Sequence, residues 1–153
     1  MLKHNGHRLR TGRYSEQGRI YLITTVTHKR EPFFSDLFLG RIIVRAFRNY
    51  HLSGHVQSLA FVVMPDHIHW LVQLNEGTSL SRLMQLFKGY TSRQINGLPG
   101  SPQTTLWQHS FHDHAIRKDE DIKGVARYIV ANPLRARLVE KIEDYPLWDA
   151  IWL

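Results

Sequence analysis

The sequence contains no cysteine, so it can build neither a disulfide framework nor a thiolate metal site. Any metal ion must therefore bind to His, Asn, Gln, Asp, Glu or backbone oxygen. No apolar run approaches the length that spans a bilayer, and residues 1–6 lack a signal-peptide core, so we expect a soluble cytoplasmic protein with no membrane partner. Acidic residues are few: the sequence has 13 Asp and Glu and 20 Lys and Arg, which gives a net charge of +7 with histidine neutral. That balance favours a polyanionic partner, most simply nucleic acid.

The length of the chain, 153 residues, is enough to bury the core of one domain without disulfides. Hydrophobic periodicity and turn residues predict a strand at 20–27, a helix at 36–51, a hairpin of strands at 56–63 and 67–74, a helix at 80–95, an extended segment at 107–117 and a helix at 120–131. This order predicts a single α+β domain over residues 1–153. We expect an antiparallel sheet packed with helices in the ferredoxin-like or RRM-like manner.

The two ends of the chain differ in composition. Residues 1–19 hold basic side chains, three glycines and almost no apolar residue. They are predicted to form a basic arm that contacts DNA phosphates through Arg8, Arg10 and Arg13. Residues 140–153 form an aromatic tail, which we expect to dock on the body of the domain.

Two histidines one residue apart, His67 and His69, follow a Pro-Asp corner at the start of a predicted strand. Because strand side chains alternate between faces, both imidazoles point one way, and the opposite, core face carries Ile68, Trp70, Val72 and Leu74. Neutral imidazole nitrogens are common metal donors, and two held side by side suit one ion. The spacing alone fits a pair of half-exposed strand histidines equally well, so a metal site needs a further ligand from elsewhere in the chain.

The helix predicted at 120–131 places a phenol and an amide one turn apart, Tyr128 and Asn132. Gly124, one turn before the phenol, is expected to leave room beside it. Such a pair could supply a nucleophile and a metal ligand together. The alternatives are an ordinary half-buried tyrosine with its hydroxyl in solvent, and an asparagine favoured at a helix end before Pro133.

Other residues compete for these roles. Tyr90 also has an amide at i+4, so spacing cannot exclude it as the nucleophile. His112 and His114 form a second His-x-His pattern, but they lack the long apolar strand that anchors the first pair. Lys88 and Arg93, which flank Tyr90, suit contacts with a DNA backbone.

Several motifs occur in a fixed order along the chain: Met64-Pro65-Asp66-His67-Ile68-His69-Trp70, Trp107-Gln108, Phe111-x-Asp113-His114-Ala115-Ile116-Arg117 and Tyr128-Ile129-x-x-Asn132-Pro133. The pattern extends to both ends with Leu9-Arg10-x-Gly12-Arg13 and Tyr145-Pro146-x-Trp148. In these motifs the sequence resembles the REP-associated tyrosine transposases, a branch of the single-tyrosine HUH transposases. The resemblance covers nearly the whole chain and implies the HUH endonuclease fold.

The resemblance also implies roles for individual residues. Tyr128 would be the nucleophile, and His67 and His69 would hold a divalent ion, Mg²⁺ or Mn²⁺, with Asn132 as the third ligand. His114 and Arg117 would lie near the site or the DNA. The implied substrate is a REP-type DNA hairpin with a single-stranded foot. Cleavage and strand transfer would pass through a 5′-phosphotyrosine, without a small-molecule cofactor, and this branch implies a monomer.

Two other functions remain compatible with the sequence. A non-catalytic DNA-binding protein descended from a transposase would keep the basic surface and lose the chemistry. A metal-dependent phosphodiester hydrolase would use the histidines and water, although the histidine-triad hydrolases need a third alternating histidine and position 71 is Leu71. A covalent protein–DNA adduct separates these functions, because only the transposase forms one.

Overall fold

The computed structural model describes residues 19–117 and 120–152. Its main elements are β1 (Ile20–Val26), α2 (Leu37–Leu52), β2 (Val56–Met64), β3 (His67–Leu74), α3 (Leu80–Asn96), β4 (His112–Ala115), α4 (Ile122–Val130), α5 (Asn132–Arg135) and β5 (Trp148–Ala150). Short 3-10 helices lie in the connections: η1 (His28–Arg30), η2 (Phe33–Ser35) and η3 (Ile142–Asp144). Within these described ranges, no helix has both the length and the apolar character needed to cross a bilayer.

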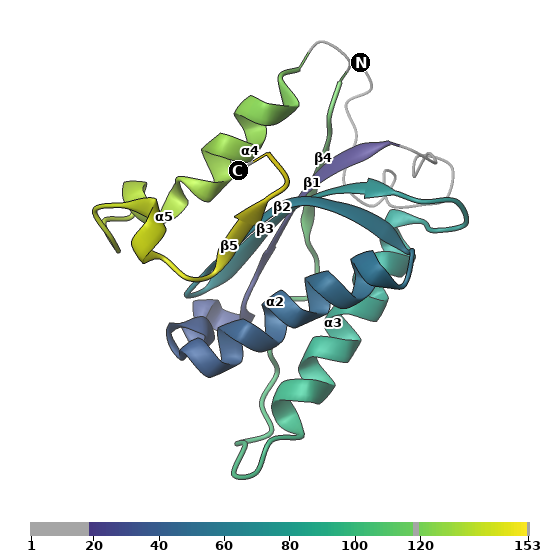
Figure 1. The fold of residues 1–153 in the computed structure, drawn as a ribbon. Helices are drawn as coiled ribbons and strands as arrows, with labels where there is room; N and C mark the ends of the chain where they lie inside the picture. Colours follow the sequence, from purple (N-terminus) through teal and green to yellow (C-terminus); the bar gives the residue numbers. More distant parts are fainter. Residues whose placement is uncertain (1–18, 118–119, 153) are drawn as a thin grey trace.

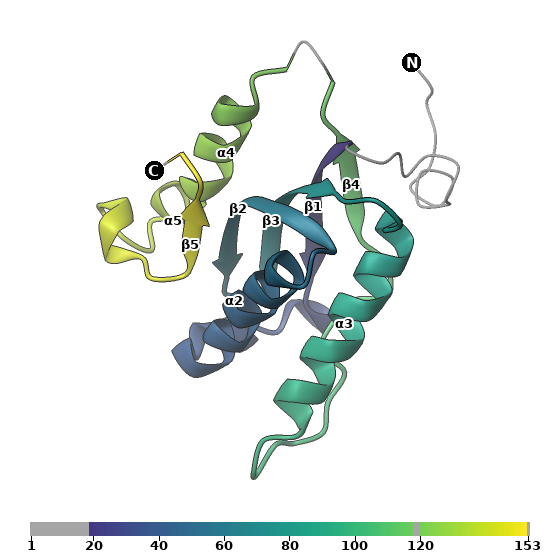
Figure 2. The ribbon, with the colours of Figure 1, turned by 45° about the vertical axis from the view of Figure 1, so that its right-hand side comes forward.

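The strands of the described residues form one antiparallel sheet in the order β4-β1-β3-β2-β5. From β1 to β4 the chain follows the β-α-β-β-α-β sequence of a ferredoxin-like fold, so the predicted α+β class is confirmed. α2 and α3 cover one face of the sheet, and α4 lies on the other face near β2 and β5 (Figures 1 and 2). In the part of the chain that the structure describes, the rest of this second face carries no helix.

The predicted core face of β3 is buried beneath α2 and α3. The indole of Trp70 lies 4.6 Å from the Phe47 ring of α2 and 5.3 Å from the Phe87 ring of α3, measured between ring centroids. The four residues of this face are at most 1% exposed: Ile68, Trp70, Val72 and Leu74. Burial of such side chains stabilises each by about 1.5–3 kcal/mol, which fixes the register of β3 and with it the direction of the histidines.

The opposite face of the sheet has a smaller apolar cluster that anchors α4. Ala126 and Ile129 of α4 pack with Val62 of β2 and Leu71 of β3, and all four are buried. Leu71 lies on the same strand face as the two histidines, since it is two residues beyond His69. The apolar cluster therefore holds α4 on the sheet face that carries the histidine pair.

The helix predicted at 120–131 is present as α4, which ends one residue earlier than predicted, and a further short helix follows it. α4 ends at Val130, the chain bends at Ala131, and a second short helix, α5, has Pro133 in its first turn. Proline fits there because its missing N–H would lack an intrahelical partner at that position in any case. Tyr128 and Asn132 therefore lie on two separate helices, α4 and α5.

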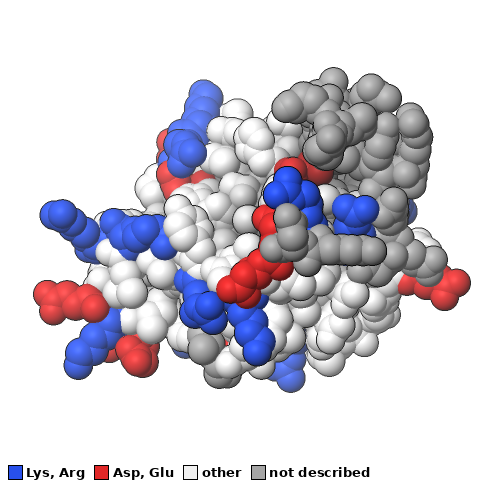
Figure 3. Space-filling view, turned by 90° about the horizontal axis from the view of Figure 1, so that it is seen from above, with Lys and Arg blue, Asp and Glu red and all other residues white. Residues whose placement is uncertain are grey.

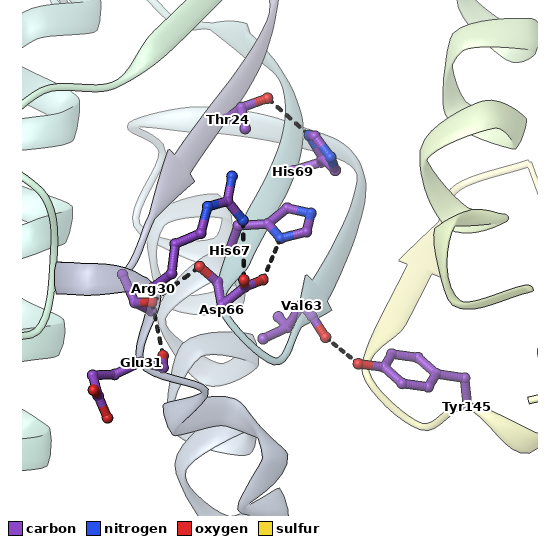
Figure 4. A network of polar contacts seen from close by, with 9 residues as sticks. Thr24, Arg30, Glu31, Val63, Asp66, His67, His69 and Tyr145 are labelled. Carbon is purple, nitrogen blue, oxygen red and sulfur yellow. Dashed lines mark hydrogen bonds and ion pairs between the residues drawn. The ribbon is translucent and has the colours of Figure 1, made fainter. Parts of the chain in front are cut away.

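Part of the aromatic tail adds a strand that periodicity did not predict. β5 pairs with Ala60–Val62 of β2, and the Tyr145 hydroxyl, just before it, donates to the Val63 carbonyl (Figure 4). Replacing Tyr145 by Phe should lower the free energy of unfolding by about 1 kcal/mol, since it removes this hydrogen bond. Urea denaturation of both proteins measures the difference.

The same substitution has a pH signature. Burial raises the pKa of Tyr145 to about 12, whereas a tyrosine in the unfolded chain ionises near pH 10. The contribution of this hydroxyl is complete below about pH 10 and is lost as the pH rises toward 12. The stability difference between wild type and Tyr145→Phe should therefore shrink over that interval, and a constant difference would contradict the assignment.

Candidate active site

The two histidines of β3 lie side by side at the start of the strand. Their ring centroids are 5.0 Å apart and the rings are nearly perpendicular, at 81°. Nδ1 of His67 lies 2.7 Å from the Asp66 carboxylate, and Nδ1 of His69 lies 2.8 Å from the Thr24 hydroxyl (Figure 4). Because each ring is held through Nδ1, each Nε2 offers a lone pair in the tautomer that carries its proton on Nδ1.

The charge state of His69 also suits metal binding. Burial lowers the pKa of His69 to about 4, and the positive charges of His67 and Arg135 add to the shift. Its imidazole is therefore neutral near pH 7. Burial by itself would raise the pKa of Asp66, but hydrogen bonds from His67 and Arg30 and their charges bring it below its ordinary value. The carboxylate is thus ionised where it meets the His67 ring.

Asp66 is itself fixed by the loop that follows β1. Nη1 of Arg30 donates to the Asp66 carboxylate at 3.0 Å, and the backbone N–H of Thr27 donates to the Asp66 carbonyl at 2.9 Å (Figure 4). The Thr27 side chain adds a bond of 3.1 Å to the same carbonyl. The corner before His67 is therefore bound to a second element, which limits the freedom of the imidazole.

Tyr128 projects from α4 on the histidine side of the sheet, and 64% of it is exposed. Its ring packs against Arg135 of α5, whose Cζ lies 3.8 Å from the ring centroid. Nη2 of Arg135 donates to the Asn132 side-chain oxygen at 2.7 Å. Arg135 thus links the two residues predicted as nucleophile and third ligand, and its charge reaches His69, whose pKa it helps to lower.

The side chain nearest to Gly124 is that of Asp121. A Cβ at this position would lie 2.7 Å from an Asp121 carboxylate oxygen, so the missing side chain makes room for Asp121. That Gly124 also leaves space beside the phenol stays a prediction. The Asp121 carboxylate also lies 3.5 Å from Nη2 of Arg127.

The side chains of this region fit a divalent ion in part. His67 and His69 offer two oriented nitrogens, and the Asn132 amide offers an oxygen, which here accepts the bond from Arg135. Among residues 19–117 and 120–152, no group of three or more His, Cys, Asp and Glu side chains could hold a metal. Within the described part of the chain, a further ligand would therefore be an amide, water or substrate oxygen, which hard ions such as Mg²⁺ and Mn²⁺ accept.

The rival tyrosine lies elsewhere. Tyr90 belongs to α3, which covers the opposite face of the sheet, and its hydroxyl accepts a hydrogen bond from Asn49 of α2 at 3.3 Å. Its ring packs edge-on against Tyr50, with centroids 6.3 Å apart. The sheet therefore separates Tyr90 from the histidine pair, a distinction that the i+4 amide could not make.

The second His-x-His pattern lies on β4. Strand register pairs Thr24 with both His69 and His112, so His112 lies on the same face of the sheet, two strands from His69. Nε2 of His114 lies 3.0 Å from the Glu120 carboxylate. The Arg117 backbone N–H and then His114 lower the pKa of Glu120, which keeps this partner ionised.

The residues predicted to contact DNA lie in different settings. Arg8, Arg10 and Arg13 fall outside the described residues. Lys88 donates to the carbonyl oxygens of Gln108 and Ser110 at 2.8 and 2.9 Å, which ties α3 to the segment before β4. The exposed side chains of Arg93 and Arg117 lie on α3 and just after β4. On the face seen in Figure 3, basic side chains alternate with acidic ones. DNA contact at these positions stays a prediction.

Sequence reasoning missed four residues of the site: Thr24, Arg30, Asp66 and Arg135. Asp66 stands next to His67 in the sequence, and a carboxylate beside a candidate ligand is a usable signal. Thr24 could be found only through the β1–β3 register. Arg30 and Arg135 could be found only once the path of the loop after β1 and the break between α4 and α5 were known.

Comparison with known proteins places the chain in a family. The model of the family "Transposase IS200 like" matches residues 17–132. A Haemophilus influenzae protein assigned to the REP-associated tyrosine transposases is 32% identical over 139 residues, covering 85% of this chain and 78% of the relative. The REP-associated tyrosine transposase of Escherichia coli is 34% identical over 89 residues, or 57% of this chain and 50% of that protein.

A solved structure shares the fold. A REP-associated tyrosine transposase bound to a REP hairpin superposes with a TM-score of 0.72 at 23% identity, covering 97% of this chain and 82% of that one. The family model and the curated relatives show the class, a tyrosine transposase. Within that class the chain belongs to the IS200-like family, on its REP-associated branch, as the resemblance of its motifs predicted.

Proposed function

We propose that this enzyme cleaves and rejoins single-stranded DNA at the foot of a REP-type hairpin, with Tyr128 as the nucleophile. The observation that supports this most is the common sheet face of the histidine pair and the α4–α5 unit that carries Tyr128 and Asn132. The hairpin bound to the structural relative supports the substrate class. Since one chain supplies all of these residues, we also expect a monomer to be sufficient.

The proposed reaction conserves the energy of the broken bond. The Tyr128 oxygen bonds to phosphorus, the P–O3′ bond breaks, the phenol releases its proton, and the departing 3′ oxygen takes one up. The product is a 5′-phosphotyrosine and a free 3′-hydroxyl, and attack by a 3′-hydroxyl on the adduct reseals DNA. His67, His69 and Asn132 would hold Mg²⁺ or Mn²⁺, which supplies polarisation of the phosphate.

A covalent-capture experiment tests the proposal. End-labelled hairpin oligonucleotides, randomised in the single-stranded foot, are incubated with the protein and Mg²⁺ and separated on a denaturing gel. We expect a labelled protein band, and sequencing of its DNA identifies the preferred foot and the cleaved bond. Cleavage without a protein-linked band would support a water-using hydrolase, and a mobility shift without cleavage would support a DNA-binding module.

The Asp66 carboxylate is expected to tune metal affinity. Asp66→Asn should weaken Mn²⁺ binding about ten- to hundredfold, because a neutral amide holds the His67 Nδ1–H less strongly and makes Nε2 a weaker donor. Titration followed by electron paramagnetic resonance measures this without DNA. Asp121→Asn is the matched control, since its carboxylate pairs with Arg127 instead. Equal affinities of wild type and Asp66→Asn would show that the carboxylate does not act on the site.

A further inference from the structure

Arg135 differs from the other arginines that surround the site. Arg30 is paired with the Asp66 carboxylate at 3.0 Å, and Arg127 with that of Asp121 at 3.5 Å. For Arg135, by contrast, the described residues provide no carboxylate partner. Its interactions there are the amide oxygen of Asn132, the ring of Tyr128 and the electrostatic effect on His69. The Arg135 guanidinium, which has no carboxylate partner among the described residues and lies beside the proposed nucleophile, is suited to bind an anion.

The geometry of the α4–α5 unit directs this cation toward the phenol. Tyr128, Asn132 and Arg135 follow the i, i+4, i+7 spacing of one helix face. Over a continuous helix the first and last would lie about 10 Å apart along the axis. The bend at Ala131 lies between them, and the guanidinium reaches 3.8 Å from the ring of Tyr128.

We propose that Arg135 is a catalytic residue of this enzyme, whose guanidinium binds the scissile phosphate beside Tyr128. The inference rests on the proposed function. A guanidinium carries five N–H groups, of which one is bonded to Asn132, so a planar edge remains for two phosphate oxygens. Packing on the Tyr128 ring fixes its plane, and attack by the phenol adds negative charge to the oxygens that it would contact.

If Arg135 only stabilised the helix, its substitutions would have different effects. A basic side chain in the last turn of a helix stabilises the helix dipole, and lysine at the same position would do this equally well. Phosphate recognition by a planar fork depends on the guanidinium, so lysine should restore it only in part. The two explanations therefore differ in the outcome for Arg135→Lys and in the effect of the DNA charge.

The test measures coupling between Arg135 and single phosphates. The foot of the captured hairpin is made with one neutral methylphosphonate at each position in turn, and binding is measured in a Tyr128→Phe background, which keeps the ring but not the nucleophile. At the cleaved phosphate, neutralisation should weaken binding about tenfold when Arg135 is present and have little further effect in Arg135→Gln. Arg127→Gln, a cation paired with Asp121, is the control and should show no such coupling.

The kinetic test uses the otherwise wild-type enzyme. Arg135→Gln should slow adduct formation about a hundredfold at saturating DNA, with Arg135→Lys between the two, while circular dichroism melts show that both variants fold. Additive effects at every phosphate, or coupling at a phosphate that is not cleaved, would overturn the role of Arg135 and leave the nucleophile assignment intact. Failure of the enzyme with Tyr128 intact to form an adduct would instead remove the proposed function, and this inference with it.

Discussion

Replacing Tyr128 by phenylalanine is expected to abolish the protein–DNA adduct, with a fall in cleavage of at least about a thousandfold. The substitution removes one oxygen from a ring that is 64% exposed, so neither the core nor α4 should lose stability. Contact between the ring and Arg135 is retained, which leaves hairpin affinity close to that of the wild type. Denaturing gels measure the adduct, and filter binding measures affinity.

Tyr90→Phe provides the matched control. Tyr90 lies on α3, beyond the sheet from the histidine pair, and its hydroxyl accepts one long hydrogen bond from Asn49. We expect this variant to form the adduct at the wild-type rate. Strand cleavage that persists in Tyr128→Phe would mean that water is the nucleophile, and loss of the adduct in Tyr90→Phe alone would transfer the role to α3.

Strand alternation explains why so much of the fold could be predicted. In β3 the apolar set points to one face over the full strand, so a one-residue slip would bury both histidines and expose Trp70. The predicted directions of His67 and His69 follow from that constraint alone. The helix capped by Ser79 also begins where predicted, because its side chain accepts from the Arg82 N–H at 3.1 Å.

Features that depend on contacts between distant segments could not be predicted in this way. β5 is three residues long, too short for a periodic signal, and it forms because β2 offers a free edge. The bond of Thr24 to His69 depends on strand register, and the packing of Arg135 on Tyr128 depends on the bend at Ala131. Each of these contacts joins elements whose relative placement no local pattern encodes.

The motifs and the geometry contribute different information about the site. Spacing alone could not separate Tyr128 from Tyr90, because both have an amide at i+4. The sheet separates them, since α3 and α4 lie on opposite faces. Conversely, an exposed tyrosine on a helix would not attract attention in the structure without the Tyr128-Ile129-x-x-Asn132-Pro133 motif that contains it.

His67→Ala and His69→Ala should each reduce adduct formation about a thousandfold in Mg²⁺, because either change removes one of two oriented nitrogen donors. Mn²⁺ affinity should fall in parallel. Hairpin affinity should change little, since both side chains are expected to bind metal and neither is positioned as a phosphate cation. His69→Gln is added as a variant that keeps much of the volume and can retain the bond to Thr24.

His112→Ala separates metal binding from a general effect of histidine loss on this face. Thr24 lies opposite His69 on β3 and opposite His112 on β4, so both histidines point to the same face of the sheet. His112, however, lies on the edge strand and is exposed. We expect its removal to leave Mn²⁺ affinity and the adduct unchanged. An adduct that forms at the full rate in His67→Ala, or in wild type treated with a chelator, would show that Tyr128 acts without a metal held by β3, and the Asn132 amide would then serve only Arg135.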